Sequence, residues 1–538
     1  MKLRVAVIAC ALVPSVAYAG GLYLPGAGAV STSRAGAAVA STSDGEALVI
    51  NPAGLAKTKG TTITVSAAII SYAAEFTRRG NYDSIDAADE SYEGQKFPTV
   101  KNASKPPLGL GSYQPIPVIT VVSDLGGAVP GLHVAAGIYA PSAYPFRDLC
   151  TQTASGCKKY KFNEDFNAAP APTRYDIMSQ EAKIFVPTVA AAYSIRPDLD
   201  VGARFGLGFA NFKSTVALWG TLNNYEEWVK QDSAFTLDAS ASWIPIFGFG
   251  VTYRPTPFLE VAANYSSKIH VDGKGSAVAE SGPNATLMGN GVVVHPETGQ
   301  QRCQDGGTAT VQRGCVTLEL PMSATIGARY KFLDHKGAER GDIELNVGWE
   351  NWGSRYASEF NVVVDGAVYV KQPSGGEVET IRLQDSIVRH NFKDTYNARL
   401  GGSYVIPATT DSDVIVRAGI GYDTAAAPDG WLRMDLDGAA RTTITAGAGY
   451  RTKKFEVNIG GGVVLEGTND NKGTCNPTGI GSDFGCNGTG TETAIGDRTH
   501  PDPISPVVSS ANQAESPINQ GTLTSHYVLL MLGATTWF

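Results

Sequence analysis

Four arginines in alternating segments of the chain are the residues best suited to bind a ligand. Arg204, Arg329, Arg399 and Arg417 each share a face of such a segment with small or polar residues. A guanidinium group can hold a carboxylate through two parallel hydrogen bonds, and the interaction is strongest where water is excluded. These side chains are therefore candidates for binding the carboxylate headgroup of an organic anion, and Arg204 and Arg399 rank first.

A structural role is the alternative for the same arginines. Four glutamates lie in the same phase of comparable segments, namely Glu260, Glu344, Glu350 and Glu456. Equal numbers of opposite charges can pair and fill an interior without any ligand. For any single arginine this second interpretation is favoured.

The histidines and serines do not form the pattern of an enzyme. Only His133, His270 and His526 fall in alternating segments, and none has a serine partner suited to nucleophilic catalysis. The glycines near Gly26 and Gly28 lack the lysine and helix of a phosphate-binding loop. We therefore expect no catalytic residue and no cofactor.

Six of the cysteines form three close pairs along the sequence, each in or at the edge of a long connection. The pairs are Cys150 and Cys157, Cys303 and Cys315, and Cys475 and Cys486. In an exported protein such pairs predict three local disulfides. None has the Cys-x2-Cys spacing of a zinc site, so no metal is expected there. The acidic turns at 435–438 and 469–471 could take calcium, although such turns are usually only solvated.

The first 19 residues have the organisation of a signal peptide. Lys2 and Arg4 precede an apolar run, and Ala17 and Ala19 provide the small residues of a cleavage site. We predict cleavage after Ala19. With 43% hydrophobic and 17% charged residues the chain is not disordered, and its net charge of −8 without a basic block argues against a nucleic-acid partner.

The elements that must position these residues are fourteen segments in which apolar and polar or small residues alternate. They are 60–76, 113–124, 131–140, 183–195, 199–213, 242–254, 258–271, 316–331, 340–352, 394–406, 413–423, 441–451, 455–466 and 525–538. Long and short connections alternate between them, as in outer-membrane barrels with tight turns at one rim and long loops at the other. The pattern predicts an all-β fold, a 14-stranded antiparallel transmembrane β-barrel over residues 60–538.

Aromatic residues favour a barrel in lipid over a soluble one. The apolar face of a strand could be buried in either, so alternation alone does not decide. However, aromatic residues end alternate strands at the rim with tight turns: Tyr193, Tyr253, Tyr330, Tyr404, Tyr450 and Phe538. Tyr265, Trp349 and Tyr422 lie near the opposite ends. Two such belts are typical of the two membrane interfaces.

Residues 20–59, which we call the hatch, are rich in Gly, Ala and Ser and too few for a separate domain. Short helices are expected over 31–40 and 43–50. Ser33-Arg34-Ala35-Gly36 and Asn51-Pro52-Ala53-Gly54-Leu55 resemble the N-terminal hatch of the FadL family of outer-membrane long-chain fatty-acid transporters. The resemblance continues through segments such as Gly137–Pro141 and Val347–Trp352, and it covers nearly the whole mature chain.

This resemblance implies a barrel plugged by a small helical hatch. It also implies uptake of a hydrophobic molecule that is captured by the external loops, passes to a pocket above the hatch and leaves sideways at a kinked third strand. Pro141 fits a strand that loses ladder hydrogen bonds at its end. Pro245 and Pro321 lie in other segments, so proline alone does not single out the third strand.

Four hatch residues are predicted to gate or anchor this segment. Pro52 fixes a backbone angle, and Asn51 can bond to a neighbouring backbone beside Ala53. A simple turn into the first strand is the alternative. Arg34 is expected to bind Glu344 or Glu350.

The resemblance predicts passive uptake of long-chain fatty acids by a monomer in the outer membrane of a Gram-negative bacterium, surrounded by lipid and lipopolysaccharide. Uptake of aromatic hydrocarbons is the first alternative. The second is a structural or adhesive barrel that acts through its loops, above all 467–524.

Overall fold

The computed structural model describes the chain except for residues 1–20, 83–89, 161–167, 219–228, 231, 282–293, 296–302, 304–312, 366, 372–377, 383–385, 429–432 and 472–520. The predicted signal peptide and the Cys475–Cys486 pair lie outside the described residues, as does most of the loop 467–524.

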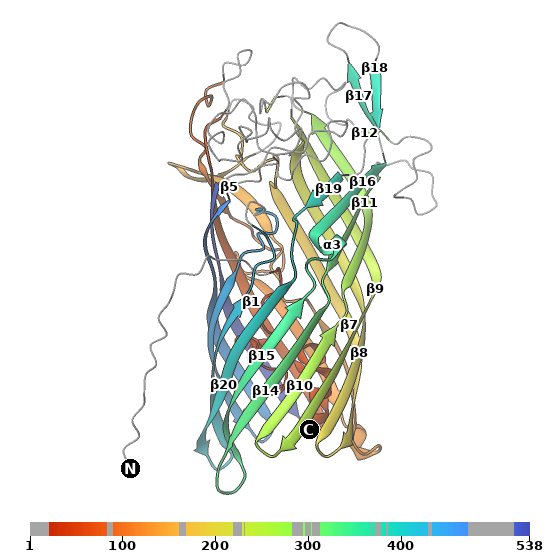
Figure 1. Cartoon of the computed structure of the whole chain (residues 1–538), viewed down its shortest axis with the longest axis vertical. Coiled ribbons are helices and arrows are strands. Elements are labelled where there is room, and N and C mark those ends of the chain that lie inside the picture. Colours follow the sequence, from red (N-terminus) through yellow and green to blue (C-terminus); the bar gives the residue numbers. More distant parts are fainter. Residues whose placement is uncertain are drawn as a thin grey trace.

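A closed antiparallel ring of strands forms the body of the molecule (Figure 1). In ring order its members are β1 (Thr61–Arg78), β3 (Gln114–Ser123), β4 (Leu132–Tyr139), β7 (Ser179–Arg196), β8 (Leu199–Leu218), β9 (Ser233–Thr256), β10 (Leu259–Ser266), β14 (Ser323–Leu333), β15 (Glu339–Glu350), β20 (Thr395–Thr409), β21 (Ser412–Asp423), β22 (Arg441–Thr452), β23 (Phe455–Asn471) and β24 (Gly521–Trp537). The ring closes where β24 pairs with β1 from Thr62↔Trp537 to Arg78↔Gly521. The predicted 14-stranded barrel is confirmed.

The alternation of side chains gives the wall two different faces. On β8, Phe205 is exposed on the outside while Arg204 and Gly206 are turned to the interior and buried. The aromatic residues predicted for the belt at the rim with tight turns are exposed as well: Tyr193, Tyr253, Tyr330, Tyr404, Tyr450 and Phe538. The outer face is thus apolar with aromatic ends, as contact with lipid requires.

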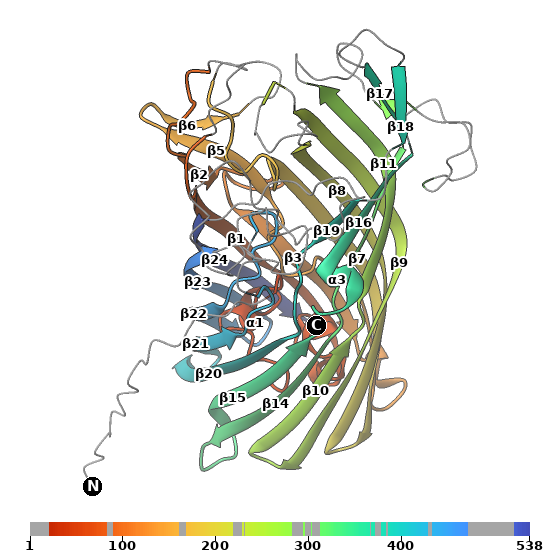
Figure 2. The same ribbon diagram turned by 45° about the horizontal axis from the view of Figure 1, so that its top comes forward.

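The hatch lies inside the ring, as Figure 2 shows for its red segment with α1. It contains α1 (Ala29–Thr32), α2 (Ala47–Ile50) and the 3₁₀ helix η1 (Pro52–Lys57). The prediction of helices over the whole of 31–40 and 43–50 is therefore wrong, because α1 and α2 each contain only four residues. The backbone turns left-handed at Ala35 and Gly36, with φ of 53° and 81°, which ends the helical path just after Arg34.

Two of the predicted strands are broken in the middle. The segment 258–271 divides into β10 and β11 (Ile269–Ser281), and the segment 316–331 divides into β13 (Arg313–Leu320) and β14. At the second break Pro321 has no backbone N–H to offer a ladder. At the first, the Ser267 hydroxyl accepts the N–H of Phe247 in place of a backbone carbonyl, at 3.0 Å.

The rim with long connections carries further short elements. They are β2 (Thr99–Asn102), β5 (Arg147–Thr153), β6 (Gly156–Lys159), β12 (Val294–His295), α3 (Arg355–Ser358), β16 (Glu359–Asp365), β17 (Ala367–Lys371), β18 (Val378–Arg382) and β19 (Ser386–Arg389), while η2 (Leu125–Gly127) lies in a tight turn at the other rim. Two disulfides lie among them, Cys150–Cys157 and Cys303–Cys315. No helix in the described part of the chain is long and apolar enough to span a membrane.

Candidate functional site: a pocket above the hatch

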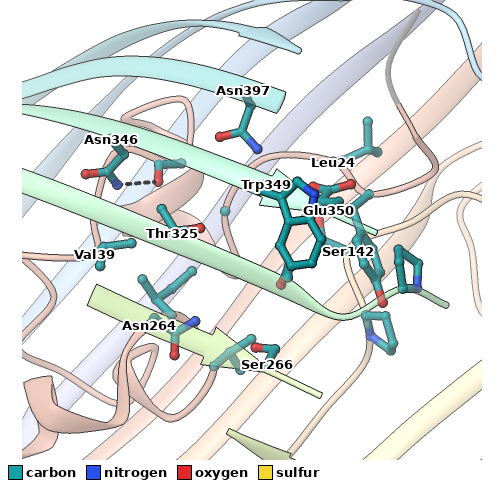
Figure 3. Close-up of a pocket in the computed structure, with 18 of the residues that line it drawn as sticks. Leu24, Val39, Ser142, Asn264, Ser266, Thr325, Asn346, Trp349, Glu350 and Asn397 are labelled. Atoms are coloured by element: carbon teal, nitrogen blue, oxygen red, sulfur yellow. Dashed lines mark hydrogen bonds between the residues drawn. The ribbon is translucent and has the colours of Figure 1, made fainter. Parts of the chain in front are cut away.

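A pocket lies between the hatch and the inner face of the wall (Figure 3). The hatch contributes Tyr23, Leu24, Val39, Val49 and Ile50 to its lining. Its floor therefore depends on where the hatch is held.

The wall gives the pocket a lining of mixed chemistry. Its apolar part comes from Tyr139, Ile246, Ile269 and Trp349. Its polar part includes Ser142, Asn264, Ser266, Ser267, Ser323, Thr325, Asn346 and Asn397, together with Arg204, Glu350 and Arg399. A small amphipathic molecule matches such a surface better than a purely apolar one.

Arg204 is the cation of this pocket that has no acidic partner. It is 6% exposed, and its guanidinium donates to the carbonyl oxygens of Leu48 (2.9 Å) and Val49 and to the Ser266 hydroxyl (2.6 Å). Within the described residues no carboxylate lies within ion-pair distance, and its Nε has no hydrogen-bond partner. A buried charge held only by neutral groups is costly, so this site favours an added anion.

Space for the Arg204 guanidinium depends on a glycine of the neighbouring strand. A Cβ atom at Gly248 on β9 would lie 2.6 Å from Nε of Arg204. The Tyr139 ring lies beside the same group, with its centroid 5.6 Å from Cζ. Strand, glycine and ring together fix the guanidinium against the pocket.

The other three candidate arginines have acidic partners. Arg399 also lines the pocket, but it binds Asp423 at 2.8 Å. Arg417 binds Glu456 at 2.6 Å. Arg329 pairs with Glu260 (2.9 Å) and Asp342 (2.8 Å), and also with Glu339. Arg329 and Arg417 do not line the pocket, so they match the structural alternative stated for them.

Unsatisfied polar atoms concentrate around the pocket. Besides Nε of Arg204 and Nε of Arg399, the amide oxygens of Asn264 and Asn397 are buried without a hydrogen-bond partner in the described structure. Glu350 accepts a bond from the Trp352 indole at 2.7 Å and forms no ion pair there. Buried polar groups are usually satisfied, so this cluster indicates a place for polar atoms of a ligand or for water.

Below the pocket, the hatch is fixed by ion pairs and hydrogen bonds. Arg34 binds Asp342 at 2.7 Å and Glu344 at 3.3 Å, but not Glu350, which was the other partner considered. The Glu344 carboxylate also accepts the backbone N–H groups of Ala40 (2.8 Å) and Ser41 (3.0 Å). The hatch therefore has a charged attachment to β15.

Asn51, Pro52 and Ala53 make a second attachment. The Asn51 side chain accepts the N–H of Ala53 at 3.1 Å and donates to the carbonyl of Val39 (2.8 Å) and to Thr252 on β9 (3.2 Å). Pro52 begins η1, where a missing N–H costs nothing. Asn51 thus stabilises the turn before the first strand, which was the simpler alternative, and it also attaches the hatch to the wall at Thr252.

Two carboxylates that hold the hatch, those of Asp342 and Glu46, were not predicted from the sequence. Asp342 follows Gly341 at the start of an alternating run, and its phase, shared with Glu344, was a usable signal. Glu46 lies in the hatch, where it accepts the N–H groups of Val30 (2.9 Å) and Ser31 (2.8 Å) and the Ser66 hydroxyl (2.8 Å). No pattern in the sequence identifies that position.

The wall is interrupted beside the pocket, and we call this interruption the first gap. β4 pairs with β7 from Leu132↔Tyr193 to Tyr139↔Val186, and the next pair on β7 is Arg147↔Gln180 with β5. No ladder pair joins residues 140–146 to residues 181–185, all of which the structure describes. Pro141 and Ser142, in this stretch, line the pocket.

Metal binding has no support in the described residues, where no three His, Cys, Asp or Glu side chains are grouped to hold an ion. In the acidic turn at 435–438, Asp435 instead binds His390 at 2.8 Å and Asp437 accepts the Tyr72 hydroxyl at 2.6 Å.

Comparison with known proteins gives one family. A family model described as outer membrane protein transport protein (OMPP1/FadL/TodX) matches residues 10–479. The fold is similar to that of a FadL homologue from Pseudomonas aeruginosa, with a TM-score of 0.64 and 15% identity, over 96% of this chain and 99% of the other. It is also similar to the toluene transporters TbuX of Ralstonia pickettii and TodX of Pseudomonas putida, each with a TM-score of 0.56 and 15% identity over 96% of this chain and 99% of the other. No curated protein sequence matches.

Proposed function

The chain belongs to the OMPP1/FadL/TodX family of outer-membrane transport proteins, and from this premise we propose that it carries long-chain fatty acids inward by diffusion. The observation that carries the proposal is Arg204, a buried cation that lines the pocket without an acidic partner among the described residues. A fatty-acid carboxylate would supply the missing charge and two hydrogen-bond acceptors.

The apolar lining would hold the chain of such a ligand. Burying apolar surface stabilises a bound tail by about 0.8 kcal/mol for each CH2 group. A ligand that remained in an aqueous lumen would lose this contribution. We therefore propose that the ligand moves from the external loops to the pocket and leaves through the first gap into the membrane, while Arg34 and Asn51 hold the hatch in place.

Aromatic hydrocarbons are the second candidate, because two of the similar structures are toluene transporters. A hydrocarbon would leave Arg204 and the unsatisfied oxygens of Asn264 and Asn397 without partners. Leaving buried polar groups unpaired costs about 1 to 3 kcal/mol for each group. The fatty acid is thus the better match to the pocket.

An adhesive barrel has no need of such a pocket or of a hatch bound at several points. We propose that the protein acts as a monomer, without catalytic activity or cofactor, among the lipids and lipopolysaccharide of the outer membrane.

Binding of oleate and oleyl alcohol to the purified barrel tests the proposal. With Arg204→Gln, we expect the affinity for oleate to fall about 10-fold or more, the result of losing a charged hydrogen bond, while the alcohol binds as before. Arg204→Lys should restore part of the affinity. Arg417→Gln, which changes an arginine outside the pocket, is the matched control.

Uptake of labelled oleate, toluene and a small sugar by cells that lack their own transporter completes the test. Oleate entry that depends on Arg204 supports the proposal. Equal binding of oleate and its alcohol by the native protein, or entry of toluene alone, would contradict it.

A further inference from the structure

The wall has a second interruption on the other side of β7 and β8, which we call the second gap. β9 pairs with β10 up to Gly248↔Ser266 and then with β11 from Ser240↔Lys274. Between these points no ladder pair joins residues 241–246 to residues 268–273, all of which the structure describes. A single backbone bond from Ser267 N–H to the Phe247 carbonyl, at 2.8 Å, closes its lower end.

β9 carries a bulge beside this gap, on the side that pairs with β8. The pairing of β9 with β8 shifts between Gly208↔Ile244 and Ala210↔Ala241, so two residues of β9 stand opposite one residue of β8. Trp243, within the bulge, has a φ of 62° and is 67% exposed on the outer face. A bulky residue rarely adopts this conformation, which locally bends the strand away from its neighbour.

One proline borders the gap, and a second lies near it at the break in the next part of the wall. Pro245 lies in β9 beside the bulge, and Pro321 lies at the break between β13 and β14. Neither has a backbone N–H to donate. Pro245 and Pro321 are the two prolines that lie outside the third strand and have no part in an exit there.

The pocket extends to the second gap. Ile246, Ser266, Ser267 and Ile269 all line the pocket and lie at or directly beside this interruption. Ile246 and Ile269 are almost fully buried, at 2% and 4% exposure, so apolar side chains close the gap where hydrogen bonds do not. Arg204 donates to Ser266 at its edge.

On the lipid side, aromatic rings connect the two gaps. Phe185 of β7 stacks on Phe209 of β8 with ring centroids 5.1 Å apart, and Phe209 meets Trp243 of β9 at 5.2 Å. Phe247, below Trp243, is exposed. The second gap therefore opens beside this aromatic surface on its β9 side, while on its β11 side the exposed Lys268 and His270 bind Glu319.

We infer that the gap between β9 and β11 is a second lateral exit, through which a ligand held at Arg204 passes between Ile246 and Ile269 into the outer leaflet. The inference rests on the proposed function, because an exit needs a ligand in the pocket. Opening the path breaks no strand pairing and displaces the apolar side chains of Ile246 and Ile269.

Ile269→Trp tests the exit directly, since the larger side chain fills the second gap from β11. Trp243→Gly is the control: it leaves the pairing of β9 unchanged, suits the positive φ and removes an exposed ring beside the gap. Ser142→Trp fills the first gap. Assembly is verified by heat-dependent migration, and uptake of labelled oleate and toluene is divided by the amount each purified variant binds.

With two parallel exits, closing either gap should lower normalised uptake about twofold, and closing both should reduce it to that of cells without the protein. Trp243→Gly should behave as the native protein. If Ser142→Trp alone abolishes uptake, or if closing the second gap changes nothing in either background, the second exit is excluded.

The choice of ligand separates this result from the proposed function. Toluene entry that responds to both gaps, without oleate entry, would overturn the fatty-acid proposal and support the exit. Entry of neither compound would overturn both.

Discussion

The hatch seam and the pocket both contain buried polar groups, but only those of the seam are largely paired. We define the hatch seam as the contacts of Arg34, Lys57, Asp342 and Glu344 below the pocket. There Arg34 binds two carboxylates, and Lys57 binds Glu260 at 3.3 Å. In the pocket, Arg204 has only neutral partners in the described structure. Pairing distinguishes an arginine that holds the fold from one that is available to a ligand.

The largest effect is expected at the seam, from Arg34→Ala. This change leaves Asp342 and Glu344 buried with one cation fewer, and breaking a buried pair typically costs about 3 to 5 kcal/mol. We expect the hatch to lose this much local stability, seen as faster hydrogen exchange of its backbone amides in the purified barrel.

A double variant shows whether the effect of Arg34→Ala comes from its ion pair with Asp342. Adding Asp342→Ala to Arg34→Ala should cost less than the sum of the two single changes, because the two side chains share one interaction. Purely additive effects would mean that the ion pair does not hold the hatch. Unchanged exchange in Arg34→Ala would remove the contrast between seam and pocket.

Asp44 lies in the hatch but outside the hatch seam, and its protonation should make the stability of the hatch depend on pH. Burial, with the neighbouring carboxylate of Glu46, raises the pKa of Asp44 to about 8. A folded-state pKa above the unfolded value of about 4 means that folding favours the protonated acid. The stability that depends on this proton is complete below pH 4 and is lost as the pH rises toward 8.

Asp44→Asn is the matched variant for this prediction. Its amide cannot ionise, so we expect hatch amides of the native protein to exchange progressively faster than those of the variant between pH 5 and pH 9, after correction for the intrinsic pH dependence of exchange. The effect should be smaller than that of Arg34→Ala, because Asp44 is only partly buried whereas Arg34 is 2% exposed. If the ratio of hatch exchange rates between the native protein and Asp44→Asn is the same at pH 5 and at pH 9, Asp44 is already ionised in the folded protein at pH 5.

The sequence was sufficient for the ring but not for its interruptions. Alternation depends on local chain geometry, so fourteen strands could be predicted from it. The same alternation runs across Ser267 and Lys268, and at the break there the Ser267 hydroxyl bonds to Phe247 of a different strand. A contact between distant segments leaves no local periodic signal.

The candidate site shows the same limit. Phase alone placed Arg204, Arg329, Arg399 and Arg417 on the inner face, but it could not say which lay beside a carboxylate. The partner of Arg399, Asp423, ends the next strand, and Asp342 is shared by Arg34 and Arg329. Pairing is a property of the assembled ring.

The smallest expected effect compares two asparagines that line the same pocket. In the orientation that satisfies both its amide atoms, Asn346 accepts the backbone N–H of Ala38 at 3.0 Å and donates to Glu344 at 2.9 Å. The amide oxygen of Asn397 is buried without a partner in the described structure. Asn346 thus belongs with the seam, whereas Asn397 belongs with the ligand.

Leucine at each position separates these roles. We expect Asn346→Leu to cost about 1 to 3 kcal/mol of hatch stability, because it leaves the bonded partners unsatisfied, and Asn397→Leu to cost none. Asn397→Leu should instead weaken oleate binding by about 1 kcal/mol, roughly 5-fold, and leave toluene binding unchanged or stronger. Hydrogen exchange and binding to the purified barrel measure the two quantities. Should Asn397→Leu destabilise the hatch as much as Asn346→Leu does, the unpaired oxygen would be structural, and the distinction between the two regions would fail at this residue.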